Sequence, residues 1–231
     1  MKTYLKVLIG LSFIGNLLVL VAILIFFLFF RDAVRNRYAL PIYENRTNQF
    51  DLLPVNNNDV IMLGNSITEH GEWTEWFGTA DVKNRGIGSD ITSGVLGRLN
   101  QITRGKPRKI FLKIGTNDIT LGYSEEEILE NYRKILKKIK SDAPQTEIYV
   151  QSILPIGGRQ SNLESRMRHI RSVNEKLRVL AAEQQVHFLD IFPSFLNSEK
   201  TELDSRFSAD GIHLNGEGYA LWVKLIEPYV R

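Results

Sequence analysis

The sequence contains no cysteine, and this absence removes several classes of site at once. Without thiols the chain cannot form disulfides, thiolate metal sites or a cysteine nucleophile. The absence does not fix the compartment, because exported proteins also occur without cysteine. Any catalytic nucleophile must therefore be sought among other residue types.

Concentrated charge is also missing. The 29 lysines and arginines nearly balance the 26 aspartates and glutamates, which gives a net charge of +3. No block of five or six like charges occurs, and no basic stripe is interleaved with aromatic residues. Nucleic-acid-binding segments usually carry such features. The sequence therefore does not favour a nucleic-acid partner.

A long hydrophobic run is present near the N-terminus. Residues 7–30, VLIGLSFIGNLLVLVAILIFFLFF, contain no charged residue. As a helix this run would be roughly 36 Å long, enough to cross a hydrocarbon core about 30 Å thick. The apolar region of a cleaved signal peptide is usually about 7–15 residues long and ends in small residues. This run is longer and ends in Phe29-Phe30-Arg31, so we expect a retained transmembrane helix that contacts the lipid bilayer.

The flanking charges say little about orientation. Lys2 and Lys6 precede the run, and Arg31, Arg35 and Arg37 follow it, so the positive-inside comparison is close to a tie. A very short N-terminal tail before a large domain resembles a signal anchor. We therefore expect a single-pass membrane protein in which residues 1–30 form a cytoplasmic tip and the span, with the C-terminal domain outside the cytoplasm.

The rest of the chain divides into two parts. Residues 31–57 are polar and broken, which is typical of a juxtamembrane linker. Residues 58–231 alternate between short apolar runs and stretches of helical period. One of these stretches begins with Ser124 and Glu127 at capping-box spacing. The strand-like runs are Val60–Leu63, Val82–Ile87, Lys109–Ile114, Ile148–Ile153 and Val186–Ile191.

This alternation predicts an α/β domain. Strands that alternate with helices form βαβ units, whose right-handed crossovers cover a parallel sheet on both faces. We expect a three-layer α/β/α sandwich with a flavodoxin-like, mainly parallel five-stranded sheet, preceded by a single transmembrane helix. In such sheets ligands bind at the carboxyl ends of the strands. Residues just past those ends are therefore the first candidates for function.

Ser66 lies in such a place, in the stretch IMLGNSITEHGEW after the first strand. Serine is a preferred N-cap, so Ser66 either caps the next helix or serves as a nucleophile. A nucleophilic serine needs a base and donors for an oxyanion. Asn117, just after Gly115-Thr116, is either a turn residue or a side-chain amide donor.

The four histidines are not equally suited to act as that base. His169 falls in a helical stretch and His187 in a strand, so both are expected to be structural or surface residues. His70 follows the serine closely, but nothing nearby in sequence orients it. His213 has Asp210 three residues earlier, which lets the carboxylate bond Nδ1–H and leaves Nε2 facing outward.

Four blocks, GNSIT, NRGIGSD, GTND and DGIH, follow one another at these positions, and together they resemble the SGNH/GDSL hydrolase family. The resemblance covers roughly residues 58–231 and is strongest to the platelet-activating-factor-acetylhydrolase-like and carbohydrate-esterase-like branches. It implies that Ser66 is the nucleophile of a Ser-His-Asp triad completed by His213 and Asp210. It also implies that Asn117 supplies an oxyanion amide.

Two positions depart from the family pattern. The first block often reads Gly-Asp-Ser, but here it is Gly64-Asn65-Ser66. The second block usually has glycine before its aspartate, where this chain has Ser89. Serine also carries the backbone N–H that the family uses there, provided that the backbone does not demand glycine. The resemblance thus assigns the oxyanion hole to Ser66, Ser89 and Asn117, with Gly88 as the alternative to Ser89.

The resemblance implies a membrane-anchored esterase that hydrolyses small acyl esters, such as acetyl, on a carbohydrate through an acyl-enzyme, with no cofactor or metal. A lysophospholipase or thioesterase held next to its lipid substrate is the alternative, and an acyltransferase could use the same triad. A non-catalytic glycan-binding module is a third reading, which the presence of Ser66 and His213 disfavours. Trp73 and Trp76 are more typical of an apolar helix face than of a sugar platform. The Gly-rich segment 154–162 lacks a phosphate-loop pattern and could form a rim of the site.

Overall fold

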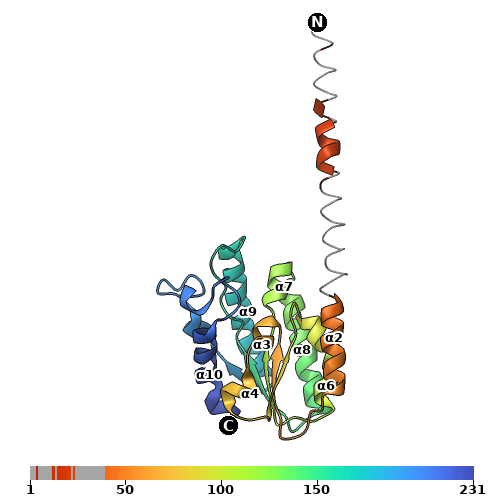
Figure 1. The fold of residues 1–231 in the computed structure, drawn as a ribbon, viewed down its shortest axis with the longest axis vertical. Coiled ribbons are helices and arrows are strands. Elements are labelled where there is room, and N and C mark those ends of the chain that lie inside the picture. Colours follow the sequence, from red (N-terminus) through yellow and green to blue (C-terminus); the bar gives the residue numbers. More distant parts are fainter. Residues whose placement is uncertain (1–3, 5–11, 14, 22, 24–39) are drawn as a thin grey trace. The chain divides into compact units, whose positions relative to one another are not determined.

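The computed structural model describes residues 4, 12–13, 15–21, 23 and 40–231 (Figure 1). Two compact units are present, Met1–Asn45 and Arg46–Arg231. Most of the predicted membrane-spanning segment, residues 7–30, lies outside the described residues; its residues 15–21 are helical. In the part of the chain that is described, no helix combines the length and the apolar character needed to cross a membrane.

The larger unit is built on a five-stranded sheet. Its strand order is β2-β1-β3-β4-β5, and every neighbouring pair is parallel. This order is the flavodoxin-like one, so the predicted α/β fold and parallel sheet are confirmed. The five predicted runs match the strands to within a few residues, and the largest difference is that the last strand is only three residues long. The strands are β1 Val60–Gly64, β2 Val82–Gly86, β3 Lys109–Lys113, β4 Glu147–Gln151 and β5 His187–Leu189.

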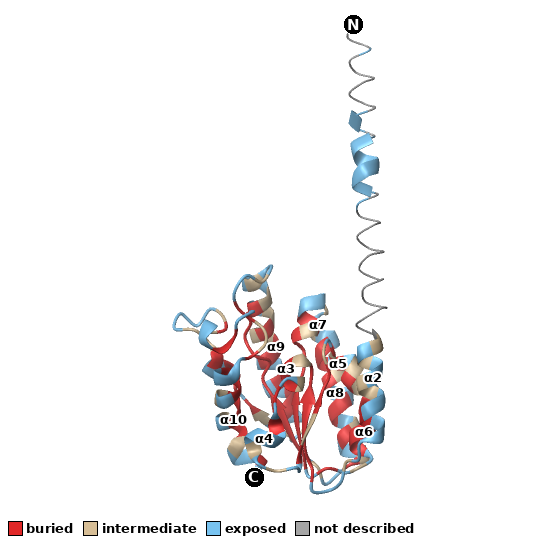
Figure 2. Cartoon of the chain, viewed as in Figure 1, coloured by how far each residue is buried: buried red, intermediate tan, exposed pale blue. Residues whose placement is uncertain are grey.

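Helices cover both faces of the sheet, which gives three layers (Figure 1). Alternate residues of each strand point to opposite faces, and both faces are buried (Figure 2). The helices are α3 Ser66–Glu69, α4 Trp73–Phe77, α5 Thr92–Arg98, α6 Asn100–Thr103, α7 Thr116–Leu121, α8 Glu125–Asp142, α9 Leu163–Glu183 and α10 Gly216–Val230, with 3₁₀ turns η2 Phe192–Phe195 and η3 Ser205–Phe207.

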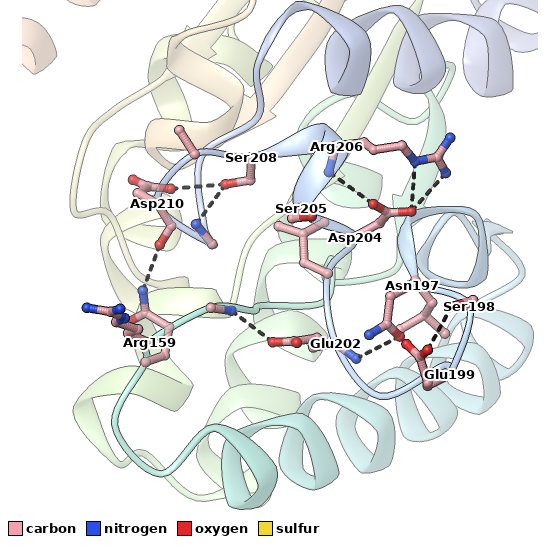
Figure 3. A pocket seen from close by; sticks show the side chains of 16 residues that line it. Arg159, Asn197, Ser198, Glu199, Glu202, Asp204, Ser205, Arg206, Ser208 and Asp210 are labelled. Atoms are coloured by element: carbon pink, nitrogen blue, oxygen red, sulfur yellow. Dashed lines mark hydrogen bonds and ion pairs between the residues drawn. The ribbon is translucent and has the colours of Figure 1, made fainter.

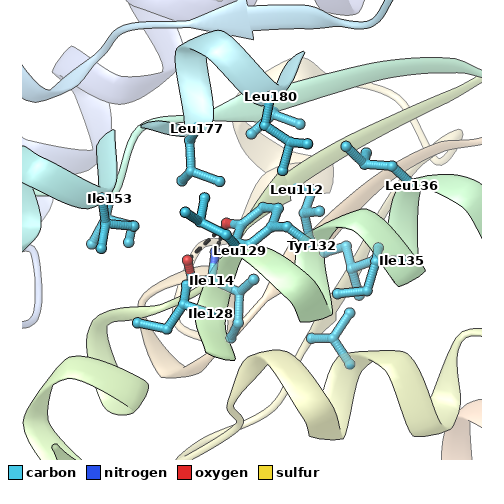
Figure 4. Close-up of a cluster of buried hydrophobic side chains, with 14 of the residues drawn as sticks. Leu112, Ile114, Ile128, Leu129, Tyr132, Ile135, Leu136, Ile153, Leu177 and Leu180 are labelled. Atoms are coloured by element: carbon cyan, nitrogen blue, oxygen red, sulfur yellow. Dashed lines mark hydrogen bonds between the residues drawn. The ribbon is translucent and has the colours of Figure 1, made fainter. Parts of the chain in front are cut away.

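Two apolar clusters hold these layers together. On one face, side chains of α5, α8 and α9 pack against Leu112 and Ile114, and the Tyr132 hydroxyl donates to the Ile114 carbonyl at 2.8 Å (Figure 4). On the other face, α4 and α10 meet through Trp73 and Trp222, whose ring centroids are 4.8 Å apart. Trp73 is thus a core residue, as the sequence favoured. Both clusters fix the sheet rigidly beneath its carboxyl edge.

Helix α8 illustrates how local sequence sets an element. The Ser124 hydroxyl accepts from the Glu127 N–H at 3.2 Å, and the Glu127 carboxylate accepts from the Ser124 N–H at 2.8 Å. This is the predicted capping box. Glutamates occupy the first turn and Lys140 the last, which suits the helix dipole.

The segment predicted to be a broken linker contains a helix, α2 Leu40–Leu52. Phe50 near its end is 1% exposed. The guanidinium carbons of Arg46 and Arg85 lie 4.6 and 4.8 Å from the centre of the Phe50 ring. The sequence did not reveal this helix because its apolar residues follow no helical stripe. Residues 46–52 are therefore part of the larger folded unit.

Candidate active site

Ser66 stands at the point where β1 passes into α3. The strand ends at Gly64, where any Cβ would lie 2.3 Å from the Lys113 carbonyl oxygen. Asn65 follows with an extended backbone, and its side chain accepts from the Ile67 N–H at 3.1 Å. Asn65 is therefore the N-cap, and Ser66 is the first helical residue. The alternative in which Ser66 caps the helix is thus wrong, and the Asn at the family's Asp position supplies the cap.

The Ser66 hydroxyl contacts a histidine from the far end of the chain. Ser66 Oγ lies 2.9 Å from His213 Nε2, and His213 Nδ1 lies 2.6 Å from Asp210 Oδ2. A carboxylate only accepts hydrogen bonds, so Nδ1 carries the proton and the neutral ring accepts the Ser66 proton at Nε2. The fold thus joins the three residues that the sequence placed in a triad, across 147 positions of the chain.

The Asp210 carboxylate is held in place from several sides. Its Oδ1 accepts from the N–H groups of Ile212 and His213, each at 2.8 Å, and from the Ser208 hydroxyl at 3.1 Å. Burial by itself raises the pKa of Asp210. Hydrogen bonds from the His213 ring and from these N–H groups lower it by a larger amount, so the pKa of Asp210 lies well below its ordinary value. Asp210 therefore stays ionised opposite the imidazole.

Hydrogen-bond donors that could face an oxyanion come from three loops. The N–H groups of Ser66 and Ser89 have no hydrogen-bond acceptor among the described residues. The Asn117 amide donates one proton to the Asp90 carbonyl at 2.8 Å, which leaves its second proton available. The Ile87 N–H donates to the Gly64 carbonyl at 3.1 Å, so the loops after β1 and β2 are joined directly.

A buried ion pair fixes the loop that carries Ser89. Arg98 of α5 binds Asp90 at 2.8 Å, with both side chains almost fully buried. The same guanidinium donates to the carbonyls of Gly64 at 3.2 Å and Arg85 at 2.9 Å. Gly64 is the last residue of β1, and Arg85 is the last but one of β2. Arg98 therefore ties the loop after the second strand to the carboxyl ends of both strands.

A second buried contact joins the loops that carry Ser89 and Asn117. The Asp118 carboxylate accepts from the Thr92 hydroxyl at 2.5 Å and from the Thr92 N–H at 3.0 Å. Burial raises the pKa of Asp118, although these hydrogen bonds act in the opposite direction. Asn131 of α8 donates to the Thr92 hydroxyl at 2.8 Å. Asp118 thus sets the spacing between the two loops.

The sequence alone did not reveal the roles of these supporting residues. Asp90 and Asp118 lie inside the quoted blocks, directly after Ser89 and Asn117, so their position was visible but their partners were not. Arg98 is the supporting residue that the sequence could have indicated, because it is a lone cation within the apolar helical stretch 91–102. Buried arginines usually have specific acceptors.

The other histidines occupy different places. His70 is exposed, and its ring centroid lies 5.1 Å from that of His213. The His70 backbone N–H donates to the Ser66 carbonyl at 3.0 Å, but the His70 ring makes no hydrogen bond to the Ser66 hydroxyl. His169 lies on α9. His187 begins β5 and stacks on Tyr149 with a centroid distance of 4.6 Å. Among the described residues, no group of three or more His, Cys, Asp or Glu side chains could hold a metal ion.

Ser89 has a backbone that favours glycine, with φ of +62°. A left-handed conformation costs a non-glycine residue about 1–2 kcal/mol, partly offset by the greater freedom of glycine in the unfolded chain. We expect Ser89→Gly to raise the free energy of unfolding by about 0.5–1 kcal/mol. Urea unfolding of the purified protein measures this change. Ser89→Ala is the matched control. It should leave stability nearly unchanged, because alanine is strained in this conformation as serine is. A Ser89→Gly protein less stable than wild type would contradict the prediction.

Known proteins resemble this chain in sequence and in fold. The model of the GDSL-like lipase/acylhydrolase family matches residues 62–221, which include all the candidate residues named above. Platelet-activating factor acetylhydrolase IB subunit alpha1 of Bos taurus is 30% identical over 168 residues, with 70% of this chain and 70% of that protein covered. Subunit alpha2 of the same enzyme from Rattus norvegicus is 31% identical over 169 residues, covering 70% and 71%.

Solved structures share the fold. A Streptococcus pneumonia protein described as a platelet activating factor superposes with a TM-score of 0.79 and 28% identity, covering 87% of this chain and 99% of its own. Axe2, an acetyl-xylooligosaccharide esterase of Geobacillus, superposes with a TM-score of 0.63 over 76% of this chain and 95% of its own. At 16% identity the latter likeness shows the fold alone.

Proposed function

The chain belongs to the GDSL-like lipase/acylhydrolase family, whose acylhydrolases and esterases are ester-hydrolysing serine hydrolases, and on this premise we propose that it removes small acyl groups of the acetyl type from a carbohydrate. The observation that carries the proposal is the hydrogen-bonded chain from Ser66 through His213 to Asp210, with distances of 2.9 and 2.6 Å, at the carboxyl edge of the sheet. A small acyl group is supported by the name of the relatives at about 30% identity, which are acetylhydrolases.

The proposed reaction has two halves. In the first, Ser66 Oγ bonds to the ester carbonyl carbon while its proton passes to His213 Nε2. The carbonyl oxygen becomes an oxyanion that accepts from the Ser66 and Ser89 N–H groups and from the Asn117 amide. Collapse breaks the bond to the alcohol oxygen, which takes the proton from Nε2 and leaves. In the second half, water gives its proton to Nε2 and attacks the acyl-enzyme, and Ser66 is restored as the acid departs.

Asn117→Ala should fold and turn over slowly. The amide bonds the transition-state oxygen more strongly than the ground-state carbonyl, so its loss should lower kcat by about 10²–10³-fold with little change in KM. Steady-state kinetics on p-nitrophenyl acetate measure both parameters. Because Asn117 also donates to the Asp90 carbonyl, thermal melting is measured in parallel. Near-full activity combined with a much lower melting temperature would make Asn117 a structural turn residue.

Hydrolysis of a lipid acyl ester or thioester is the competing function. Leu121, which ends the short helix that begins beside Asn117, is 66% exposed and would suit an apolar chain. The deciding experiment is a panel assay of the full-length chain. It compares p-nitrophenyl esters of increasing chain length, O-acetylated saccharides, a lysophospholipid and an acyl thioester, with Ser66→Ala as the background. Highest kcat/KM on acetyl esters of saccharides supports the proposal, whereas a preference for long acyl chains or the lysophospholipid overturns it.

We also propose that residues 7–30 are retained and anchor the protein in a membrane, with residues 58–231 outside the cytoplasm. The uncharged run in the sequence supports this anchor. Intact-mass measurement of protein extracted from membranes should show residues 1–30 still attached. Recovery of a soluble form that begins near Arg31, made by normal processing, would overturn the proposal.

A further inference from the structure

A large cavity opens beside the acid end of the triad. Its volume is about 1020 Å³. The walls come from the loop after β4, residues 158–160, from the segment 196–206 and from the turn Ser208–Gly211 (Figure 3). Asp210 belongs both to this wall and to the triad, whereas Ser66 and His213 do not line the cavity. The cavity therefore adjoins the triad through Asp210.

Most of the residues that line the cavity are polar or charged. Leu196, Leu203 and Ala209 are the apolar side chains in it, and none of the residues that line it is aromatic. Sites for apolar ligands are lined mainly by hydrophobic and aromatic side chains. A lipid chain would find little apolar surface here and would desolvate many polar groups. The ligand that fits this wall offers hydroxyl groups along its length.

The lining holds four carboxylates, Glu199, Glu202, Asp204 and Asp210, and two guanidinium groups, Arg159 and Arg206. Asp204 accepts from Arg206 at 2.8 and 2.9 Å, whereas the Glu202 carboxylate accepts from the Gly158 N–H at 2.8 Å and Asp210 contacts the His213 ring. The excess of carboxylates disfavours an anionic ligand. A neutral ligand is compatible with this lining.

Some donors and acceptors in the wall are still available. The Arg159 guanidinium and the Ser205 hydroxyl have no hydrogen-bond partner in the part of the chain that the structure describes. The Gln160 amide nitrogen donates to the Asp210 carbonyl at 2.9 Å, which leaves the Gln160 oxygen as an acceptor. Figure 3 shows Arg159 on the Asp210 side of the cavity, across from Asn197 and Ser198. These groups are placed to bind a molecule that lies between the two walls.

Hydrogen bonds also fix the position of the cavity wall relative to the triad. The Gly157 N–H donates to the Gly211 carbonyl at 2.8 Å, and Gln160 reaches the Asp210 carbonyl from the same loop. Gly211 has φ of +80°, and a Cβ there would lie 1.9 Å from the Gly157 oxygen, so only glycine permits this contact. The loop after β4 and the turn that carries Asp210 therefore behave as one piece. A ligand in the cavity is held at a fixed position relative to His213.

We propose that this cavity is a subsite for the saccharide part of the ester, holding the sugar units beyond the one that carries the acyl group, with Arg159 as its principal free donor. The inference depends on the proposed function, because it assigns the alcohol side of that same reaction. Cavities of about 300–1,000 Å³ enclose ligands larger than a single sugar ring. The substrate class is therefore an acylated oligosaccharide.

The test uses full-length chain and two kinds of ester. The probes are p-nitrophenyl acetate, which has an acetyl group and no sugar, and partially O-acetylated xylotetraose and chitotetraose. Arg159→Ala should lower the ratio of kcat/KM for the better saccharide over kcat/KM for p-nitrophenyl acetate by roughly 10-fold, mainly through KM, because a hydrogen bond from a charged group is lost. Ser205→Tyr, which narrows the cavity without touching the triad, should lower the same ratio. Arg133→Ala on α8, an exposed arginine outside the cavity, is the matched control and should not change it.

The outcomes separate the subsite from the function. An unchanged ratio in both variants, or an equal loss on both kinds of ester, overturns the subsite even if wild type is an esterase. Binding of unacetylated xylotetraose or chitotetraose to the Ser66→Ala protein is followed by NMR titration. Binding that weakens with Arg159→Ala supports the subsite even if wild type hydrolyses neither ester, in which case the proposed function fails alone. Wild type that hydrolyses p-nitrophenyl acetate but neither cleaves nor binds the saccharides overturns the subsite.

Discussion

Replacement of Ser66 by alanine should lower kcat/KM for p-nitrophenyl acetate by on the order of 10⁵-fold, and His213→Ala should lower it by a similar factor. Ser66 Oγ is the atom proposed to bond the acyl carbon, and His213 Nε2 at 2.9 Å is within reach of its proton. Because the two groups act in one step, the double variant should be no slower than either single variant. Background-subtracted initial rates on purified protein measure all three.

The control for this prediction is His70→Ala. His70 is the imidazole that also lies close to the triad, with its ring centroid 5.1 Å from that of His213. The His70 ring makes no hydrogen bond to the Ser66 hydroxyl, so its removal should change the rate by no more than a few-fold. Circular dichroism melting of each variant establishes that the folds are intact. Loss of activity in His70→Ala, with a near-normal rate in His213→Ala, would make His70 the base and remove the triad assignment.

The positions of Ser66, Asn117 and His213 could be predicted because the chemistry and the fold point to the same edge of the sheet. Each lies in a polar block near the end of a strand or in the last loop, and parallel strands bring such blocks together. The strands themselves were visible as apolar runs. The predicted strands β1 and β3 are correct to within one residue.

The contacts that hold these blocks in place could not be predicted. Arg98 is a lone cation on a helix, and it meets the carbonyls of Gly64 and Arg85, near the ends of β1 and β2, only in the folded structure. The left-handed backbone at Ser89 follows from those contacts and not from the residue type, since serine there argues against it. Local patterns therefore located the candidate groups that the fold brings together, whereas the contacts that hold them depend on partners distant in sequence.

The burial of Lys113 in the core also could not be predicted from the local sequence. It ends β3 in a run that was predicted as an apolar strand, yet its side chain is 1% exposed. Strand alternation puts Lys109, Phe111 and Lys113 on one face, and two lysines in such a row usually indicate solvent. That face is instead covered by α10, whose Trp222 ring lies 4.9 Å from the Lys113 Nζ. The covering helix comes about a hundred residues later, so no local pattern could reveal the burial.

Lys113→Met should therefore stabilise the protein. Lys113 Nζ has no hydrogen-bond partner within the described part of the chain, and burial lowers the pKa of its amine to about 7. A charged amine in the core that faces the Trp222 ring but has no hydrogen-bond acceptor is costly, and an apolar side chain of similar length fills the same space. We expect the free energy of unfolding at pH 7 to rise by about 2–4 kcal/mol, measured by urea unfolding of the full-length chain in mild detergent.

The pH dependence of that gain has a definite sign. In the unfolded chain a lysine titrates near pH 10.4, whereas the folded protein loses the Lys113 proton near pH 7. Between these values the unfolded state binds more protons, so this group makes the wild-type free energy of unfolding rise with pH. The penalty on wild type is complete below pH 7 and fades toward pH 10. The advantage of Lys113→Met should therefore be largest at pH 6–7 and should shrink as the pH approaches 10.

Lys109→Met on the same strand and face is the matched control. Lys109 Nζ donates to the carbonyls of Tyr229 at 2.6 Å and Arg231 at 3.0 Å, so its removal leaves two acceptors without a donor. This variant should be less stable than wild type, by about 1–3 kcal/mol. If Lys113→Met were instead destabilised at every pH, to the same extent as Lys109→Met, the Lys113 amine would have to be a bonded and charged group in the core. We expect Lys113→Met to stabilise the protein and Lys109→Met to destabilise it, although the two lysines are four residues apart on the same face. The difference would show that the gain in Lys113→Met comes from removing a buried amine that has no hydrogen-bond acceptor.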